Sequence, residues 1–201
     1  MKRLLAGLLV SATMAAPIVA AALKPNDKAP DFSAKGSLAG KEIDFSLKSA
    51  LKKGPVVVYF YPSAFTGGCN IQAHTFAENK EKFDAAGASI IGVSRDSIVR
   101  LNAFSADPQY CAGKIAVASD PDGSIATSYG LTTMNIKPGM KDSRGVEIDH
   151  EFTERTTFVV TADGKIAATF STSDDKISPA EHVQKALAAV QQLGGNKSAQ
   201  N

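Results

Sequence analysis

The residue best suited to covalent chemistry is Cys69, which follows an apolar run and opens a helix candidate. The run Val56–Tyr61 is β-branched and aromatic, as in buried strands, and a helix is expected over 67–86. A helix start offers free backbone N–H groups and a positive dipole end, which stabilise a thiolate. Cys69 is therefore a candidate nucleophile, with Gly67 and Gly68 leaving room for a small substrate. The alternative is a buried structural cysteine.

The elements that must position this turn alternate between strands and helices, which predicts an α/β architecture with one central sheet. In the first half of the chain we expect a hairpin within 32–46, helical turns in 46–53, strands over 88–94 and 115–119, and a helix capped by Asp96 and running to Ala106. In the second half we expect a hairpin of 156–161 and 165–170. A final helix should start at the capping box Ser178–Glu181 and end at Gly194. The segment 132–153 fits no element. A loop of that length is usually functional, an interface or a missed element.

The N-terminus reads as a targeting segment. Residues 1–22 combine basic Lys2 and Arg3, an apolar stretch over 4–10 and small residues at 20–22, the pattern of a secretory signal peptide. An uncleaved anchor is the alternative, although polar residues and a proline interrupt the apolar stretch. Cleavage would remove two cations and lower the formal charge from +2 to zero. Export, with the periplasm as the expected destination, allows disulfides to persist.

Composition excludes several other classes of protein. The 201 residues are 44% hydrophobic and 21% charged, which argues against a disordered, collagen-like or polytopic membrane chain. One domain is expected over 23–195, followed by a disordered tail over 196–201. No basic run suggests nucleic acid or an anionic membrane surface. Two cysteines are too few for a disulfide scaffold, and His74, His150 and His182 have no ligand spacing, so we expect no metal or other cofactor.

The spacing around Cys69 is similar to a known motif. Pro62-x-x-x-Thr66-x-x-Cys69 after an apolar strand resembles the active-site motif of the peroxiredoxins, in the alkyl hydroperoxide reductase and thiol-specific antioxidant superfamily. The downstream stretch Glu154–Val160 resembles that family's strand with its characteristic arginine. The resemblance covers roughly 25–193 and is nearest to the bacterioferritin-comigratory-protein type. It implies a thioredoxin-like fold: a central mixed sheet flanked by helices, with an added N-terminal β-hairpin.

The resemblance also implies roles for four residues. Cys69 would be the peroxidatic nucleophile, Thr66 would hydrogen-bond the thiolate and the peroxide, and Pro62 would pack over the site and limit water. Arg155 would keep the sulfur ionised and orient the substrate. Physical chemistry agrees, because attack on an O–O bond builds negative charge that fixed donors stabilise, and arginine stays charged. The alternative for Thr66 is a helix N-cap, which is compatible with catalysis.

Some features depart from the pattern or admit another interpretation. Arg155 could instead form an ordinary ion pair with Glu154 or Asp149. His74 stands where some single-domain members carry a resolving cysteine, so that variant is excluded. Gln72 stands where many relatives have glutamate, which puts a carboxylate role there in doubt.

The second cysteine, Cys111, is the candidate resolving residue, since some relatives place one in the corresponding helix. Its alternatives are a buried spectator and a permanent structural partner of Cys69. The predicted function is a secreted thiol peroxidase that reduces hydrogen peroxide and small organic hydroperoxides through a sulfenic acid. A thioredoxin-like or glutaredoxin-like protein would supply thiols to a monomer or homodimer. The rivals, a thiol–disulfide oxidoreductase and a non-catalytic redox or metal-binding module, would want a second cysteine near Cys69.

Overall fold

The computed structural model describes residues 21–198, so most of the expected signal peptide over 1–22 lies outside the described residues. In chain order the elements are β1 (Ser33–Leu38), β2 (Lys41–Ser46), α1 (Leu47–Leu51), β3 (Val56–Phe60), α2 (Gly67–Ala85), β4 (Ser89–Ser94), α3 (Ile98–Ala106), β5 (Ala116–Ser119), α4 (Ser124–Ser128), β6 (Thr133–Met134), β7 (Phe152–Thr153), β8 (Thr156–Val160), β9 (Ile166–Ser171), α5 (Thr172–Asp175) and α6 (Pro179–Ser198). Within the described residues, no helix is long and apolar enough to cross a membrane.

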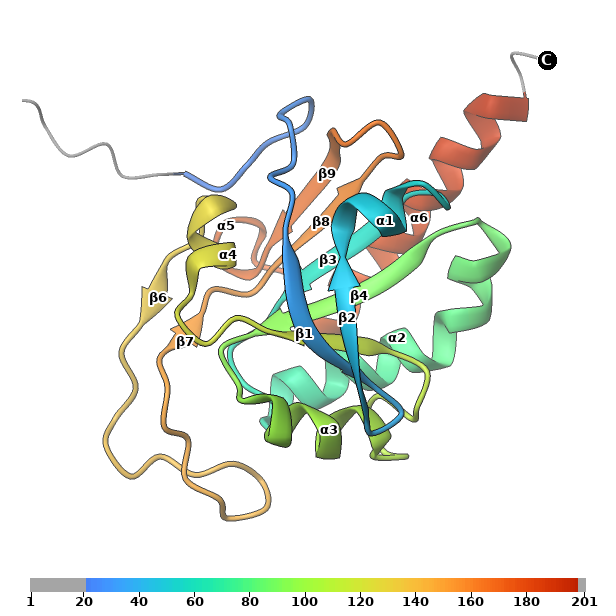
Figure 1. Ribbon diagram of the computed structural model, residues 1–201. Coiled ribbons are helices and arrows are strands. Elements are labelled where there is room, and N and C mark those ends of the chain that lie inside the picture. Colours follow the sequence, from blue (N-terminus) through green and yellow to red (C-terminus); the bar gives the residue numbers. More distant parts are fainter. Residues whose placement is uncertain (1–20, 199–201) are drawn as a thin grey trace, which may run out of the picture.

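Seven strands form one mixed sheet in the order β2-β1-β5-β4-β3-β8-β9 (Figure 1). The pairs β3–β4 and β4–β5 are parallel, and the other pairs are antiparallel. The N-terminal hairpin β1–β2 joins the sheet through β5. The predicted thioredoxin-like mixed sheet with an added hairpin is confirmed.

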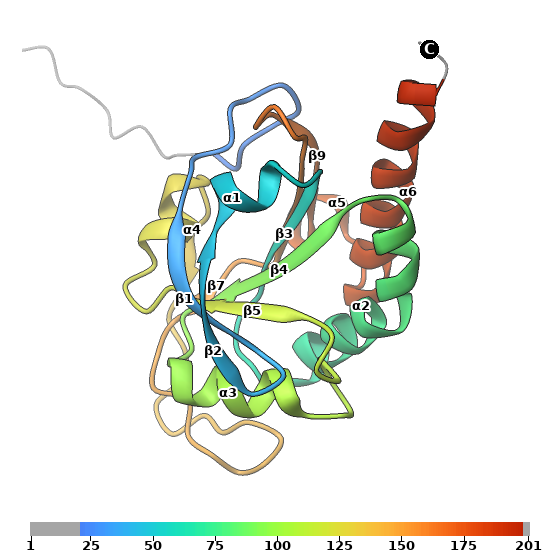
Figure 2. The ribbon, with the colours of Figure 1, turned by 45° about the vertical axis from the view of Figure 1, so that its right-hand side comes forward.

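Both faces of the central strand β3 are covered. Val57 and Tyr59 face a core shared with α2, α3 and α6, whereas Val56, Val58 and Phe60 face a core closed by α1 and α4. Figure 2 shows α2 and α6 on one side of the sheet, with α1 and α4 on the other. Because strand side chains alternate, burial on both faces explains the unbroken apolar run.

Element ends agree with the sequence in some places and not in others. The capping box is confirmed, since Ser178 N donates to Glu181 Oε2 (2.7 Å) and Glu181 N donates to Ser178 Oγ (3.3 Å). The predicted end of the last helix at Gly194 is wrong, because α6 continues to Ser198. Of the tail expected to be disordered, 196–198 therefore continue α6, and 199–201 lie outside the described residues.

The segment 132–153 forms a long excursion whose base is closed by the short antiparallel pair β6–β7 (Figure 1). An isolated antiparallel β-bridge between Lys141 and Glu147 joins the two sides of its outer part. Two-residue strands lie below what a periodicity of alternating residues can reveal. The segment is thus a missed element, and its contacts are with the turn that precedes Cys69.

Candidate active site

The structure places Cys69 in the first turn of α2, directly beyond the carboxyl end of β3. Its side chain is only 2% exposed. The helix begins at Thr66, whose carbonyl accepts from Asn70 N (2.8 Å). Cys69 therefore belongs to the first turn of a 19-residue helix, where backbone N–H groups lack intrahelical acceptors and the helix dipole is positive.

Arg155 reaches the same sulfur from the neighbouring strand. Because β8 runs antiparallel to β3 and Thr156 pairs with Phe60, the residue before β8 lies at the end of β3 where α2 starts. Arg155 Nη2 donates to Cys69 Sγ at 3.1 Å. Sheet pairing thus brings together a cysteine and an arginine that are 86 positions apart in the chain.

The rest of the guanidinium is held in place. Arg155 Nη1 donates to Gln72 Oε1 at 2.5 Å, so the amide oxygen at this position supplies the acceptor. A Cβ on Gly68 would lie 3.1 Å from Arg155 Nη2, whereas one on Gly67 would meet nothing within 4 Å. Gly68 therefore leaves space for the arginine, and Gly67 borders open space as expected.

The ion pair considered for Arg155 is not found. Among the described residues, neither Glu154 nor Asp149 forms a salt bridge with it. The Glu154 carboxylate accepts instead from the hydroxyl of Ser173 (2.7 Å) and that of Thr132 (3.1 Å). The donors of Arg155 are left for Gln72 and the sulfur.

Thr66 and Pro62 lie on the turn that joins β3 to α2, and both are partly buried. The Thr66 hydroxyl donates to the Ser63 carbonyl (2.8 Å) and makes no side-chain capping bond, although its backbone forms the N-cap of α2. Because its proton goes to Ser63, the hydroxyl does not donate to the Cys69 sulfur as expected, but its oxygen can still accept a hydrogen bond from a ligand. The hydroxyl thus shapes the turn, and it lies three residues before Cys69.

A buried carboxylate holds this turn from behind. Asp96 accepts from Ala64 N (2.7 Å), from Ser63 Oγ (3.0 Å) and from Ser94 Oγ (2.7 Å). The prediction that Asp96 caps the following helix is wrong, because Ser97 accepts from Arg100 N in that role. Asp96 instead points into the protein, where its carboxylate accepts hydrogen bonds from the turn. A helix cap would accept them from the free N–H groups of the helix.

The excursion 132–153 clamps the same turn from outside. Ser143 N donates to the carbonyl of Phe65 (2.9 Å), and the Arg144 guanidinium lies 3.2 Å from the centre of the Phe65 ring. Asp142 accepts from Arg100 Nη2 (2.8 Å) and Arg144 Nη2 (3.0 Å). Phe65 has a left-handed φ of 61°, which is unusual for a bulky residue and is stabilised by these contacts.

His150 ties the excursion to Asp96. Its Nε2 lies 3.0 Å from Asp96 Oδ1, and its Nδ1 lies 2.9 Å from the Glu151 carbonyl. Burial opposes the charged imidazole, but the hydrogen bond and negative charge of Asp96 prevail and raise the pKa of His150. Burial likewise opposes the Asp96 carboxylate, and His150 with the Ala64 N–H lowers its pKa. The two groups form a buried ion pair.

Sequence reasoning did not find the roles of Asp96 and His150, because each is distant in the chain from the groups it contacts. No spacing signal could have revealed them. Among the described residues, no group of three side chains could hold a metal ion.

Cys111 lies in the turn that follows α3 and is fully buried. Both cysteines are free thiols, so no structural disulfide joins them. They belong to one apolar cluster that also contains Tyr59. Burial, with a smaller effect of the Asp107 charge, raises the pKa of the Cys111 thiol. Cys111 is therefore protonated where it lies, and reaction at its sulfur would need local opening.

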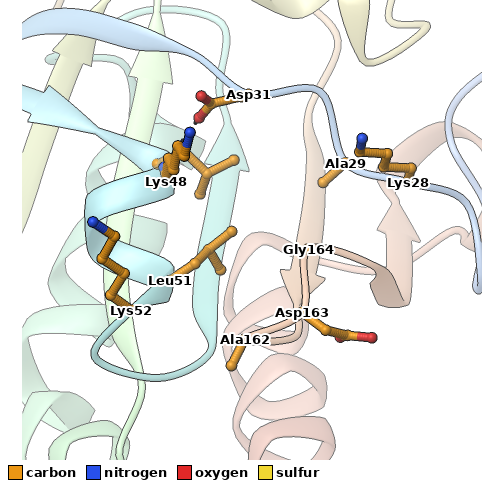
Figure 3. A pocket seen from close by; sticks show the side chains of 10 residues that line it. Lys28, Ala29, Asp31, Lys48, Leu51, Lys52, Ala162, Asp163 and Gly164 are labelled. Atoms are coloured by element: carbon orange, nitrogen blue, oxygen red, sulfur yellow. Dashed lines mark hydrogen bonds between the residues drawn. The ribbon is translucent and has the colours of Figure 1, made fainter.

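A hollow of about 470 Å³ lies at the other end of the sheet (Figure 3). Lys48, Leu51 and Lys52 of the α1 region line one side, and the turn 162–164 lines the other. That turn follows the last residue of β8, which pairs with the first residue of β3. The hollow is therefore at the opposite end of β3 from Cys69 and takes no part in this site.

The chain is similar in sequence and fold to several known proteins. The family model described as "AhpC/TSA family" matches residues 25–169. A putative peroxiredoxin of Mycobacterium tuberculosis is 35% identical over 144 residues, which are 72% of this chain and 82% of the relative. The crystal structure of peroxidoxin BcpB from the same species superposes with a TM-score of 0.69 and 26% identity, over 85% of this chain and 97% of that one. The bacterioferritin comigratory protein of Xanthomonas campestris, whose structures were solved to explain its alkyl peroxide reduction activity, gives 0.61 and 27%, over 80% and 91%.

Proposed function

The chain belongs to the AhpC/TSA family as a peroxiredoxin of the bacterioferritin-comigratory-protein type, and we propose that it is an exported peroxidase acting through Cys69 sulfenic acid. Peroxiredoxins are thiol-dependent peroxidases. The observation that carries the proposal is the bond from Arg155 Nη2 to Cys69 Sγ at the start of α2.

The proposed reaction begins when the Cys69 thiolate attacks one oxygen of the peroxide. The O–O bond breaks, the attacked oxygen stays on sulfur as a sulfenic acid, and the other oxygen takes a proton and leaves as water or an alcohol. Arg155 and the free N–H groups of the first turn stabilise the charge that develops on the leaving oxygen. The Thr66 oxygen accepts from the proton of the bound peroxide, and Pro62 limits water.

Hydrogen peroxide and small organic hydroperoxides are the proposed substrates. Gly67 borders open space beside the nucleophile. Gly68 has no side chain, which leaves room for Arg155. The alkyl peroxide reduction described for the Xanthomonas campestris protein supports the organic class.

Cys111 is the proposed resolving residue. Its thiol would attack the sulfenic sulfur of Cys69, release water and leave a disulfide. Both sulfurs are buried and one is in a helical turn, so local unwinding must precede the bond. Shared membership of one apolar cluster supports this pairing. A thioredoxin-like or glutaredoxin-like dithiol would then reduce the disulfide.

Export to the periplasm is proposed from residues 1–22 alone, and removal of that segment leaves a chain of zero formal charge. Fusion of residues 1–22 to a reporter that is active only in an oxidising compartment would test export. A reporter that stays in the cytoplasm would contradict it.

Stopped-flow consumption of hydrogen peroxide by the reduced protein tests the activity, with Cys69→Ser as control. We expect one equivalent of peroxide to remove both thiols of the wild type and to yield a Cys69–Cys111 peptide in mass spectrometry. Cys111→Ser should react once and stop at the sulfenic acid. A wild type that also stops there would exclude Cys111 as the resolving residue, and a Cys69→Ser variant as fast as wild type would exclude the peroxidase mechanism.

A further inference from the structure

Beside the Arg155 guanidinium, three buried polar side chains form a row across three elements. They are Gln72 of α2, Thr157 of β8 and His182 of α6, and each is 0% exposed. Buried polar groups are costly unless every donor and acceptor has a partner, so the order of hydrogen bonds along such a row is fixed.

The direction of the row starts from Arg155, which can only donate. Its Nη1 bond of 2.5 Å requires the oxygen of the Gln72 amide on that side. The amide nitrogen of Gln72 must then face Thr157 Oγ1, 3.4 Å away, and donate to it. A rotated amide would place an NH2 group against the guanidinium.

The direction continues into His182. Among the described residues, the side-chain partners of Thr157 Oγ1 are Gln72, which donates to it, and His182 Nδ1 at 3.0 Å, so the buried hydroxyl proton is satisfied only by donating to Nδ1. Nδ1 is then the acceptor and the ring proton is on Nε2, which donates to Thr172 Oγ1 at 2.8 Å. Thr172 N donates to the Arg155 carbonyl (3.1 Å), so the row returns to the residue where it began.

Electrostatics keeps this arrangement intact at neutral pH. Burial, followed by the positive charge of Arg155, lowers the pKa of His182 to about 4. A protonated ring would point a second donor at Thr157, disturb the bond order and place two positive charges close together.

We propose that His182 is a positioning residue, whose Nε2-protonated imidazole acts through Thr157 to orient the Gln72 amide and thereby to aim Arg155 at Cys69. The inference rests on the proposed function of Cys69 as the nucleophile. His182 touches neither the sulfur nor the substrate. By this inference it nevertheless helps to set the reactivity of Cys69.

Two matched pairs of variants test the row. Thr157→Ser keeps the hydroxyl and Thr157→Val keeps the shape, while His182→Asn offers an amide oxygen in place of Nδ1 and His182→Leu offers no acceptor. We expect Thr157→Val and His182→Leu to react with hydrogen peroxide roughly tenfold more slowly than their partners. The pH profile of Cys69 alkylation by iodoacetamide, read by mass spectrometry, should move to higher pH in the same two variants.

The outcomes separate this inference from the proposed function. If the folded wild type does not consume peroxide, the function fails, and the alkylation profile still tests the row. If folded Thr157→Val matches Thr157→Ser in both measurements, positioning through the hydroxyl is refuted. Nitrogen-15 NMR reads the tautomer in the wild type itself, and His182→Asn serves only to assign the His182 signals by their loss. A proton on Nε2 supports the row and a proton on Nδ1 overturns it.

Discussion

Alanine at Gly68 should impair the site although it creates no cavity and removes no polar group. A Cβ there would lie 3.1 Å from Arg155 Nη2 and 3.3 Å from Pro179 Cγ, closer than ordinary contacts, which begin at 3.4 Å. Gly67 is the matched control, because its Cβ would meet nothing within 4 Å. Neither glycine has a left-handed φ, so alanine fits the backbone at both positions.

The size of the effect follows from what must move. Pro179 is part of the backbone that begins α6, whereas the guanidinium is the end of a flexible side chain, so the guanidinium is the group that retreats, by a few tenths of an ångström. Its bond to Cys69 Sγ, 3.1 Å in the structure, would lengthen and lose alignment as the guanidinium moves. Hydrogen bonds to charged groups contribute about 1.5–3 kcal/mol. Losing about half of the upper value would slow the reaction roughly tenfold.

The assay compares the two variants under identical conditions. We expect Gly68→Ala to consume hydrogen peroxide roughly tenfold more slowly and Gly67→Ala to stay within about twofold of wild type. Alanine replaces glycine in the first turn of α2 in both, so any gain of up to about 1 kcal/mol in helix stability is shared. Equal rates in the two variants would refute the reasoning, because only a Cβ at position 68 would meet Arg155 and Pro179.

Other substitutions test the remaining contacts. Arg155→Lys should react at least roughly tenfold more slowly in stopped flow, because lysine keeps the charge but cannot donate to the sulfur and to Gln72 together. A wild-type rate in this variant would show that Arg155 is not part of the site. Thr66→Ser should retain most activity and Thr66→Val should lose much more; equal losses would show that packing explains the residue. The free energy of unfolding of wild type should exceed that of His150→Gln most between about pH 4 and 6.5. The lowered pKa of Asp96 makes the pair's contribution disappear as pH falls through it, and the raised pKa of His150 makes it disappear as pH rises through it, so a pH-independent difference would contradict the ion pair.

The sequence alone determined the local parts of this protein. The unbroken apolar run of β3, the glycine-rich start of α2 and the capping box of α6 each depend on residues close together in the chain. For that reason the strand–turn–helix unit with Cys69 in its first turn could be predicted, and so could the order of the longer strands and helices, whereas α4, α5 and the β6–β7 pair were missed. Arg155 was predicted only through the family resemblance, since no local rule pairs residues 86 positions apart.

Tertiary structure decided what holds the site. Asp96 is a residue type that often caps helices, yet its carboxylate accepts from Ala64 N. The folded core places this buried donor closer to the carboxylate than the N–H groups of the helix. Gly194 is a residue type that often ends helices, yet α6 continues beyond it. The low helix propensity of glycine, about 1 kcal/mol, does not by itself end a packed helix. The excursion 132–153 has no periodic pattern, and its place is set by contacts with Phe65, Asp96 and Arg100, which are distant in the chain. These interactions depend on distances in space between residues far apart in the chain, which local propensity does not contain.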